Sequence, residues 1–327
     1  MKDDDAVIHL RLIVPPELAA ATFDRLRETP GVAHVVHLRA VSTSPTGDVL
    51  LCDVARESAN DVIEWLQSEG VHRRGAITVE ALEAVISDAG ALAEADAPGH
   101  AADALIWEEL DARAHADSAL TVSFLVFTCV AAIIAGVGIL LDAPILIVGA
   151  MVVGPEYGPL SALCIAVARR RAVGASRATS TLATGLLAAA AATLLATLAF
   201  RGTGLAPDRY DLSDRELTAF ISHPDGMAAV VAVLAGIVGM LSLTEARGGA
   251  LIGVLVSVTT IPAVANIGVA TAYQEWGEVR GAALQLGVNL LGLIVAGVVT
   301  LVVQSRATTS PNGPAATTSV RSSRRTY

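Results

Sequence analysis

LTVSFLVFTCVAAIIAGVGIL, residues Leu120–Leu140, contains no charged side chain. A helix needs about 20 predominantly apolar residues to cross the roughly 30 Å of hydrocarbon in a lipid bilayer, so this stretch is long enough to span one. Of the 327 residues in the chain, 53% are hydrophobic and 17% are charged, and the mean hydropathy is +0.59. Most acidic residues lie within residues 1–117, and several uncharged apolar runs follow. This pattern predicts a polytopic membrane protein with a soluble N-terminal part.

The apolar runs predict about six membrane spans. They are Leu120–Leu140, Pro144–Val167, Thr181–Phe200, Met227–Leu243, Gly249–Ala272 and Ala282–Val303. Arginines cluster after the second and sixth spans, whereas the connection after the third span is acidic. Because arginine-rich flanks stay in the cytoplasm, we expect both termini there. The first apolar run, Ala6–Pro15, is too short and too acidic in its flank for a signal peptide, and we expect a multi-pass protein of the plasma or inner membrane.

Residues 1–85 are predicted to form a small cytoplasmic α+β domain with the ferredoxin-like order βαββαβ. The expected strands are Val7–Val14, Val32–Val41, Val49–Val54 and Ala76–Leu82. The expected helices run from Pro16 to Leu26 and from Ser58 to Glu69, with Ser58 as the N-cap. A connector at 86–117, a membrane domain at 118–304 and a disordered cytoplasmic tail at 305–327 complete the predicted organisation.

The connector is expected to contain a juxtamembrane helix over Ala101–His115. Its apolar residues Ile106, Trp107 and Leu110 suit a helix at the membrane surface, with the tryptophan at the level of the headgroups. Packing against the soluble domain is an equally good interpretation.

An internal repeat relates the two halves of the membrane domain. Ala135–Leu140 resembles Ala235–Met240, and, after a four-residue slip, Ile147–Val152 resembles Leu251–Val256. Each match has the same place in a three-span unit. Because three is odd, the second unit enters the membrane from the opposite side, which gives a 3+3 inverted repeat as in many secondary transporters. The alternative is a chance match between apolar helices rich in glycine and alanine.

The second helix of each three-span unit is predicted to be interrupted, at Gly154–Pro159 and at Thr259–Asn266. Proline removes a backbone donor and glycine permits non-helical dihedral angles. Paired breaks in corresponding helices point to a substrate or ion site near the middle of the membrane. The residues expected at this site are Gly154, Pro155, Glu156, Gly158, Pro159, Thr259, Thr260, Pro262, Asn266 and Asn289.

Glu156 is the most informative of these residues. An ionisable group within a span costs roughly 3 kcal/mol or more and is a functional candidate by default, as a proton carrier or a cation ligand. The alternative is that the break lies near the interface and Glu156 faces water. The threonines and the two asparagines at membrane depth have an alternative too, as interhelical hydrogen-bonding groups.

Other kinds of site are not expected. Three scattered cysteines (Cys52, Cys129 and Cys164) form neither a disulfide framework nor a zinc motif. His34 and His37, joined by His9 or His72, are poor metal ligands because their spacing in a strand puts the first two on opposite faces. The spans contain neither a Gly-x-Ser-x-Gly motif nor paired carboxylates, so we expect no enzyme. The chain has no basic face for nucleic acid, and its cofactors are unknown.

Several of these segments together resemble the domain-of-unknown-function-389 family of membrane proteins. In the first half they are Ile133–Leu140 and Val148–Met151, followed by Pro155 and Pro159 and the arginine cluster. In the second half they are Leu251–Val254, Pro262 and Asn266–Ala270, with Asn289-Leu290-Leu291 in the last span. The resemblance covers about residues 118–303 and implies the membrane architecture, with a similar ferredoxin-like domain upstream.

The sequence departs from the family pattern at two positions. Pro155-Glu156 stands where the family usually has Pro-Leu, and Ile261-Pro262 stands where Pro-Pro is usual. We therefore do not expect Glu156 to be an essential residue of the whole family. The resemblance implies no substrate.

Two functions from different classes fit the sequence. The first is a transporter or channel-like permease for an unidentified small solute or ion, regulated by its cytoplasmic domain. The second is a non-transporting membrane sensor or scaffold that oligomerises through its membrane and ferredoxin-like domains. Small residues at helix-packing spacing, such as Ala235 with Gly239, let backbones approach closely, either within a protomer or between protomers. We expect a homo-oligomer in the lipid bilayer.

Overall fold

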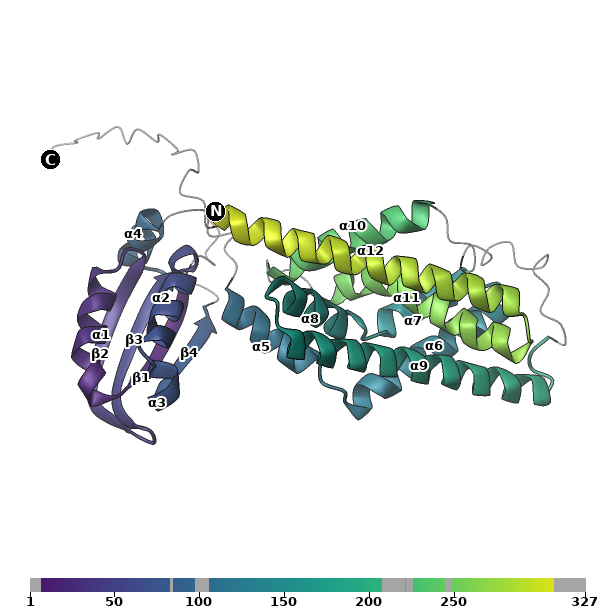
Figure 1. Ribbon diagram of the computed structural model, residues 1–327, viewed down its shortest axis with the longest axis horizontal. Coiled ribbons are helices and arrows are strands. Elements are labelled where there is room, and N and C mark those ends of the chain that lie inside the picture. Colours follow the sequence, from purple (N-terminus) through teal and green to yellow (C-terminus); the bar gives the residue numbers. More distant parts are fainter. Residues whose placement is uncertain are drawn as a thin grey trace. The chain divides into compact units, whose positions relative to one another are not determined.

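The computed structural model describes residues 7–82, 85–97, 106–207, 221, 226–244 and 249–308 (Figure 1). The chain divides into two compact units. We call residues 1–106 with 304–327 the soluble unit, and residues 107–303 the membrane unit. Each is described by itself.

The soluble unit contains a four-stranded sheet with helices. Its elements are β1 (Val7–Val14), α1 (Pro16–Glu28), β2 (Val32–Thr43), β3 (Thr46–Ala55), α2 (Arg56–Ser68), α3 (Val71–Arg74), β4 (Ala76–Ala81) and α4 (Asp88–Asp96). The strand order is β2-β3-β1-β4, and every neighbouring pair is antiparallel. The predicted order of strands and main helices is confirmed, and the short helices α3 and α4 are additions to it.

The residues of β1 alternate between buried and less buried positions, and the buried ones contribute to the core of the soluble unit. Ile8, Leu10 and Leu12 are fully buried and belong to one apolar cluster with Leu26 of α1 and Ile63 of α2. Successive strand residues point to opposite faces, so the residues between them lie on the other face of the sheet. The core also buries the thiol of Cys52, and this burial raises its pKa to about 12.

Two expectations for the soluble unit need correction or refinement. Ser58 does not cap α2, because the helix begins at Arg56 and its N-cap is Ala55. Ser58 is instead buried beneath Gly31, where an added Cβ would lie 2.4 Å from its hydroxyl oxygen. Of the apolar residues expected in the juxtamembrane helix, Ile106 packs into the core of the soluble unit. Most of the N-terminal half of that helix lies outside the described residues.

The membrane unit is helical. Its elements are α5 (Trp107–Asp117), α6 (Val122–Leu140), α7 (Pro144–Val153), α8 (Tyr157–Ala168), α9 (Ala172–Gly202), α10 (Gly226–Thr244), α11 (Gly249–Ala272) and α12 (Trp276–Thr308). Among the described residues, α6, α9, α10 and α12 are each long and apolar enough to cross a membrane. If the bent pair α7–α8 is counted as one span, the described residues contain up to five spans. The described stretch Thr260–Ala272 of α11 is a shorter apolar helix.

Small residues let these helices pack closely. A Cβ at Gly268 of α11 would lie 2.7 Å from the carbonyl oxygen of Ala190 in α9. A Cβ at Gly236 of α10 would lie 2.6 Å from the carbonyl oxygen of Leu293 in α12. Such contacts allow backbones to approach closely, as is usual between helices in membranes. The apolar core of this unit draws mainly on α6, α7, α9 and α11, with single residues from α8, α10 and α12.

Candidate functional site

The candidate site begins at the break between α7 and α8. The axes of these two helices differ by 58°, and Gly154, Pro155 and Glu156 separate them. Gly154 has an extended backbone (φ −66°, ψ 125°). This conformation is the one that the ring of a following proline favours, because the ring crowds the helical alternative. The predicted interruption is confirmed at Gly154–Glu156, whereas Gly158 and Pro159, which were also assigned to it, already belong to α8.

Glu156 is completely buried at this break. Its carboxylate oxygen Oε1 accepts a hydrogen bond of 2.8 Å from the hydroxyl of Thr260 in α11. The carboxylate also lies against Gly154, where an added Cβ would be 2.5 Å from Oε2. The absence of a side chain at Gly154 therefore leaves room for the carboxylate. The alternative in which Glu156 faces water is wrong, since none of its surface is accessible.

The second predicted interruption is wrong. Helix α11 continues from Gly249 to Ala272 with Pro262 inside it. A proline within a helix removes one hydrogen bond, but neighbouring helices can support the backbone around it. Here Ile261 and Ala263 on either side of Pro262 are almost fully buried. Packing therefore keeps this segment helical where the local sequence favours a break.

The other predicted site residues fall into separate places. Gly158 packs against the end of α5, where an added Cβ would lie 3.0 Å from Cβ of Asp117. Asn266 and Asn289 are each 2% exposed, and Nε2 of Gln285 donates to Oδ1 of Asn289 at 3.4 Å. The structure thus joins Gly154 and Glu156 to Thr260. Pro155 is half-buried, Pro159 and Pro262 are buried, and the side chain of Thr259 lies outside the described residues.

Tyr157 is a residue of the site that the sequence analysis missed. Its hydroxyl donates a 2.7 Å hydrogen bond to the carbonyl of Gly239, which ties the start of α8 to α10. A small pocket of about 10 Å³ adjoins this contact and is lined by Tyr157, Leu160, Ser161 and Cys164 of α8 with residues of α10 and α12. This is about the volume that a single water molecule requires. A tyrosine directly after a charged residue at a predicted break was the available signal.

A second polar cluster in the membrane unit joins α5 to the turn between α8 and α9. Asp111 of α5 forms ion pairs with Arg169 and Arg171, the latter at 2.7 Å. The guanidinium of Arg169 also lies 5.2 Å from the ring centroid of Trp107. Trp107 therefore has a protein partner in its own unit, and α5 packs on α8.

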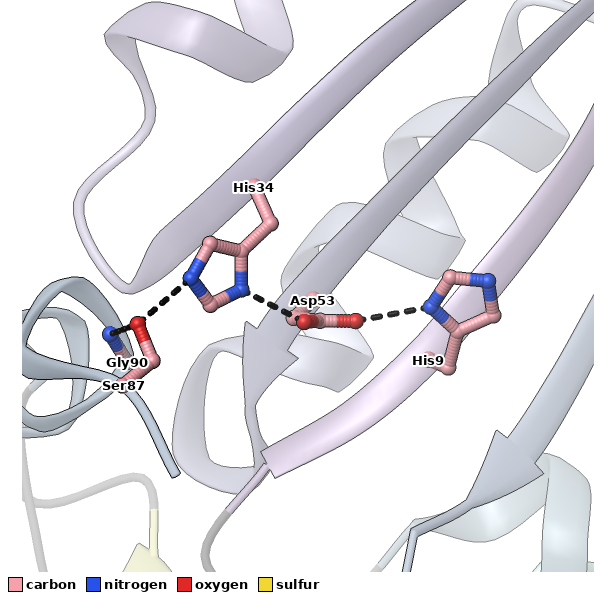
Figure 2. Close-up of polar contacts among 5 residues, drawn as sticks. All are labelled: His9, His34, Asp53, Ser87 and Gly90. Atoms are coloured by element: carbon pink, nitrogen blue, oxygen red, sulfur yellow. Dashed lines mark hydrogen bonds and ion pairs between the residues drawn. The ribbon is translucent and has the colours of Figure 1, made fainter. Parts of the chain in front are cut away.

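The soluble unit carries a polar network on the face of the sheet opposite the main core (Figure 2). Asp53 of β3 lies between two imidazoles: its Oδ1 is 2.7 Å from Nδ1 of His9 and its Oδ2 is 2.6 Å from Nδ1 of His34. On its other side His34 contacts the hydroxyl of Ser87 at 2.7 Å. That hydroxyl accepts the N–H of Gly90 and so caps α4.

This network holds α4 on the sheet. His34 reaches both partners from an irregularity in β2, where its φ is +50° and the register with β3 shifts. His37 faces the other way and pairs with Asp48 at 2.7 Å, beside the ring of Phe23 in α1. The expectation that His34 and His37 lie on opposite faces is confirmed. Among the described residues, no group of three metal-ligating side chains comes together.

Fold and site together define an integral membrane protein: a helical unit with a buried acid at a broken helix, preceded by a small antiparallel α+β unit. Residues 151–295, from α7 into α12, match the model of a family described as a domain of unknown function, DUF389. The family resemblance of the membrane unit is thereby confirmed. No curated protein and no solved structure matches the chain.

Proposed function

We propose that the protein is a transporter or channel-like permease for a small solute or ion, with Glu156 and Thr260 at its site. The observation that carries this proposal is a fully buried carboxylate at a helix break, hydrogen-bonded to a threonine of another apolar helix. Burial of a carboxylate costs several kcal/mol unless polar partners compensate for it. Such a group at membrane depth is typical of ion and proton pathways.

The proposal includes six spans in a 3+3 inverted repeat, in which α6, the pair α7–α8 and α9 correspond to α10, α11 and α12. Contact geometry supports it. Glu156 and Thr260 are 104 positions apart, which is the spacing that pairs Ile147 with Leu251 in the repeat. Equivalent residues that contact each other lie close to the axis that relates the two halves. The site would therefore lie at the centre of the unit.

Further pairs of contacts support the same axis. The sulfur of Cys164 in α8 lies 3.9 Å from the carbonyl oxygen of Ile294 in α12. In the repeat, Gly268 of α11 corresponds to Cys164, and Ala190 of α9 corresponds to Ile294. An added Cβ at Gly268 would lie 2.7 Å from the carbonyl oxygen of Ala190. If a two-fold axis relates the two halves, each contact between the halves must be matched by a second contact between the equivalent residues. Both α8 and α11 are also followed, two residues after their last helical residue, by a left-handed residue, and these two residues, Arg170 and Gln274, have the same spacing of 104 positions.

The chemistry of the site suits a cation or a proton. A carboxylate with a threonine hydroxyl offers hard oxygen ligands, which Na⁺-like or divalent ions prefer, and the carboxylate alone can carry a proton. The C-terminal end of α7 at Gly154 adds backbone carbonyls, whose dipoles also favour a cation. Movement of one half against the other would expose this site to each side in turn. We place the protein in the plasma or inner membrane with both termini in the cytoplasm and propose no enzymatic step.

The test is flux in liposomes that contain the purified full-length protein. We expect uptake of one member of a panel of monovalent and divalent cations, or of protons, above that of empty liposomes. Glu156→Gln should lower this flux at least tenfold, because it removes the charge and keeps the shape. Thr260→Val should reduce the flux less, because the carboxylate remains.

The matched control is Glu275→Gln, which makes the same change at an exposed residue before α12. It should leave the flux unchanged. Absence of flux across the whole panel from a folded wild-type protein would refute the proposal, as would a flux that Glu156→Gln does not alter.

A non-transporting sensor or scaffold is the second candidate. The observation that favours it is the small volume, about 10 Å³, of the pocket beside the break. In this case the soluble unit would bind a ligand, the membrane unit would anchor and oligomerise, and Glu156 would serve to fix the packing of α8 on α11. A homo-oligomer that persists at high dilution, together with no flux, would favour this function over transport.

A further inference from the structure

A pocket of about 460 Å³ lies among α5, α8 and the first turn of α9, away from the residues around Glu156. Most of its walls are apolar, from Ala114, Ala162, Ile165, Ala166, Ala172 and Val173. Its polar groups come from α5 and from the arginine-rich start of α9. The volume is in the range of ligand sites, which are typically about 300–1,000 Å³.

The lining of this pocket has an excess of positive charge. Among the described residues that line it, the one carboxylate is that of Asp111, which is engaged by Arg171 and also by Arg169 just outside the lining. Arg177 approaches the imidazole of His115, at 3.2 Å between Nη1 and Nε2. An imidazole carries no negative charge, so this contact does not neutralise the guanidinium. The pocket therefore attracts an anion to the side where Arg177 lies.

Apolar surface continues from the pocket to the outside of the membrane unit. Val173 in its wall is 84% exposed, and Val167, near the end of α8, is 42% exposed. Large exposed apolar side chains beside a charged turn are expected where a helix leaves the hydrocarbon for the headgroup layer. A ligand that fits such a pocket has a negative head and an apolar body.

We propose that this pocket binds the phosphate of an anionic phospholipid, with Arg171 and Arg177 as its phosphate-binding side chains. Arginine forms paired hydrogen bonds with phosphate oxygens, and basic pockets between helices on the cytoplasmic side are recognised sites for acidic headgroups. The phosphate lies between the two guanidinium groups, and the glycerol region covers the alanine-lined wall. The apolar wall is the reason to choose a lipid over free phosphate, which would gain nothing from it.

The test uses delipidated full-length protein in detergent and native mass spectrometry of bound lipid. Phosphatidylglycerol should bind more tightly than phosphatidylcholine of the same chain length. The double variant Arg171→Gln with Arg177→Gln should weaken phosphatidylglycerol binding by about fivefold for each arginine removed. Millimolar inorganic phosphate should not displace the lipid.

Two further variants keep the result interpretable. Arg280→Gln is the matched charge control, because Arg280 is exposed near the start of α12. That region lies by the far end of α9, where Arg201 contacts the carbonyl of Ala272, so lipid binding should be unchanged. Ala172→Leu fills the pocket without changing charge, and it should weaken binding even where the double variant fails to fold.

Two results would overturn the proposal. One is unchanged phosphatidylglycerol affinity in Ala172→Leu and in the arginine variants that fold. The other is displacement of the lipid by inorganic phosphate, which would identify a site for a free anion. Neither depends on whether Glu156 supports flux.

Discussion

At the scale of single residues, the buried site depends on Gly154 as much as on Glu156. The dihedral angles of Gly154 are open to any residue before a proline, so its backbone does not require glycine. The space around this residue does require glycine, because an added Cβ would lie 2.5 Å from Oε2 of Glu156 and 3.0 Å from Ile261. The glycine is therefore part of the carboxylate site.

Gly154→Ala should consequently displace the carboxylate and weaken its bond with Thr260. We expect a loss of roughly 1–3 kcal/mol in stability, the usual cost of overpacking in a filled core. Thermal unfolding of the purified protein in detergent measures it. Gly149→Ala is the control on the same helix, because a Cβ there meets nothing within 4 Å. It should be neutral or slightly stabilising, and equal melting temperatures for the two variants would contradict the assignment.

At the scale of elements, local sequence predicts well where the signal is local. The alternation of β1 and the Gly154-Pro155 break each depend on a few neighbouring residues, and both were predicted. Pro262 carries an equally strong local signal, yet α11 continues through it because the residues around it are buried against other helices. The network around Asp53 joins four segments, so it could not be derived from the spacing of His34 and His37 alone.

The β2–β3 hairpin offers a prediction of pH dependence. Asp48 accepts a hydrogen bond from the backbone N–H of Ala40, and with the neighbouring His37 this contact lowers the pKa of its carboxyl below the ordinary 3.8. A depressed pKa stabilises the fold above the ordinary value, and the contribution is lost as pH falls through the lowered value. Hydrogen exchange at the Ala40 amide, corrected for its intrinsic pH dependence, should therefore quicken only in acid.

Asp48→Asn removes the charge and is the matched variant for this measurement. Near neutral pH, Ala40 should exchange faster in the variant than in the wild type, and the two should converge in acid below the lowered pKa. Equal protection of Ala40 in both proteins near pH 7 would contradict the role of the carboxylate.

At the scale of the whole molecule, the inverted arrangement that we propose constrains which ends of the helices share a side of the membrane. Helix α9 has 31 residues, which is about 46 Å of helix and more than the hydrocarbon thickness. The exposed residues Ser176, near its start, and Thr203, directly after its end, must therefore lie on opposite sides of the membrane if α9 spans it. The arginines before Ser176 predict that this end lies in the cytoplasm.

We therefore predict that a membrane-impermeant maleimide labels Thr203→Cys in intact cells. Ser176→Cys and Thr43→Cys, in the soluble unit, should be labelled only after permeabilisation. Wild-type protein gives the background, because Cys52 and Cys164 are buried and Cys129 is half-buried.

Labelling of Ser176→Cys and Thr203→Cys from the same side would show that α9 does not cross the membrane. Labelling of Ser176→Cys alone in intact cells would reverse the orientation and place the arginine pocket on the external leaflet. Either result would also require a new assignment of the side from which a solute reaches Glu156, since the order of the spans fixes that side once α9 is oriented.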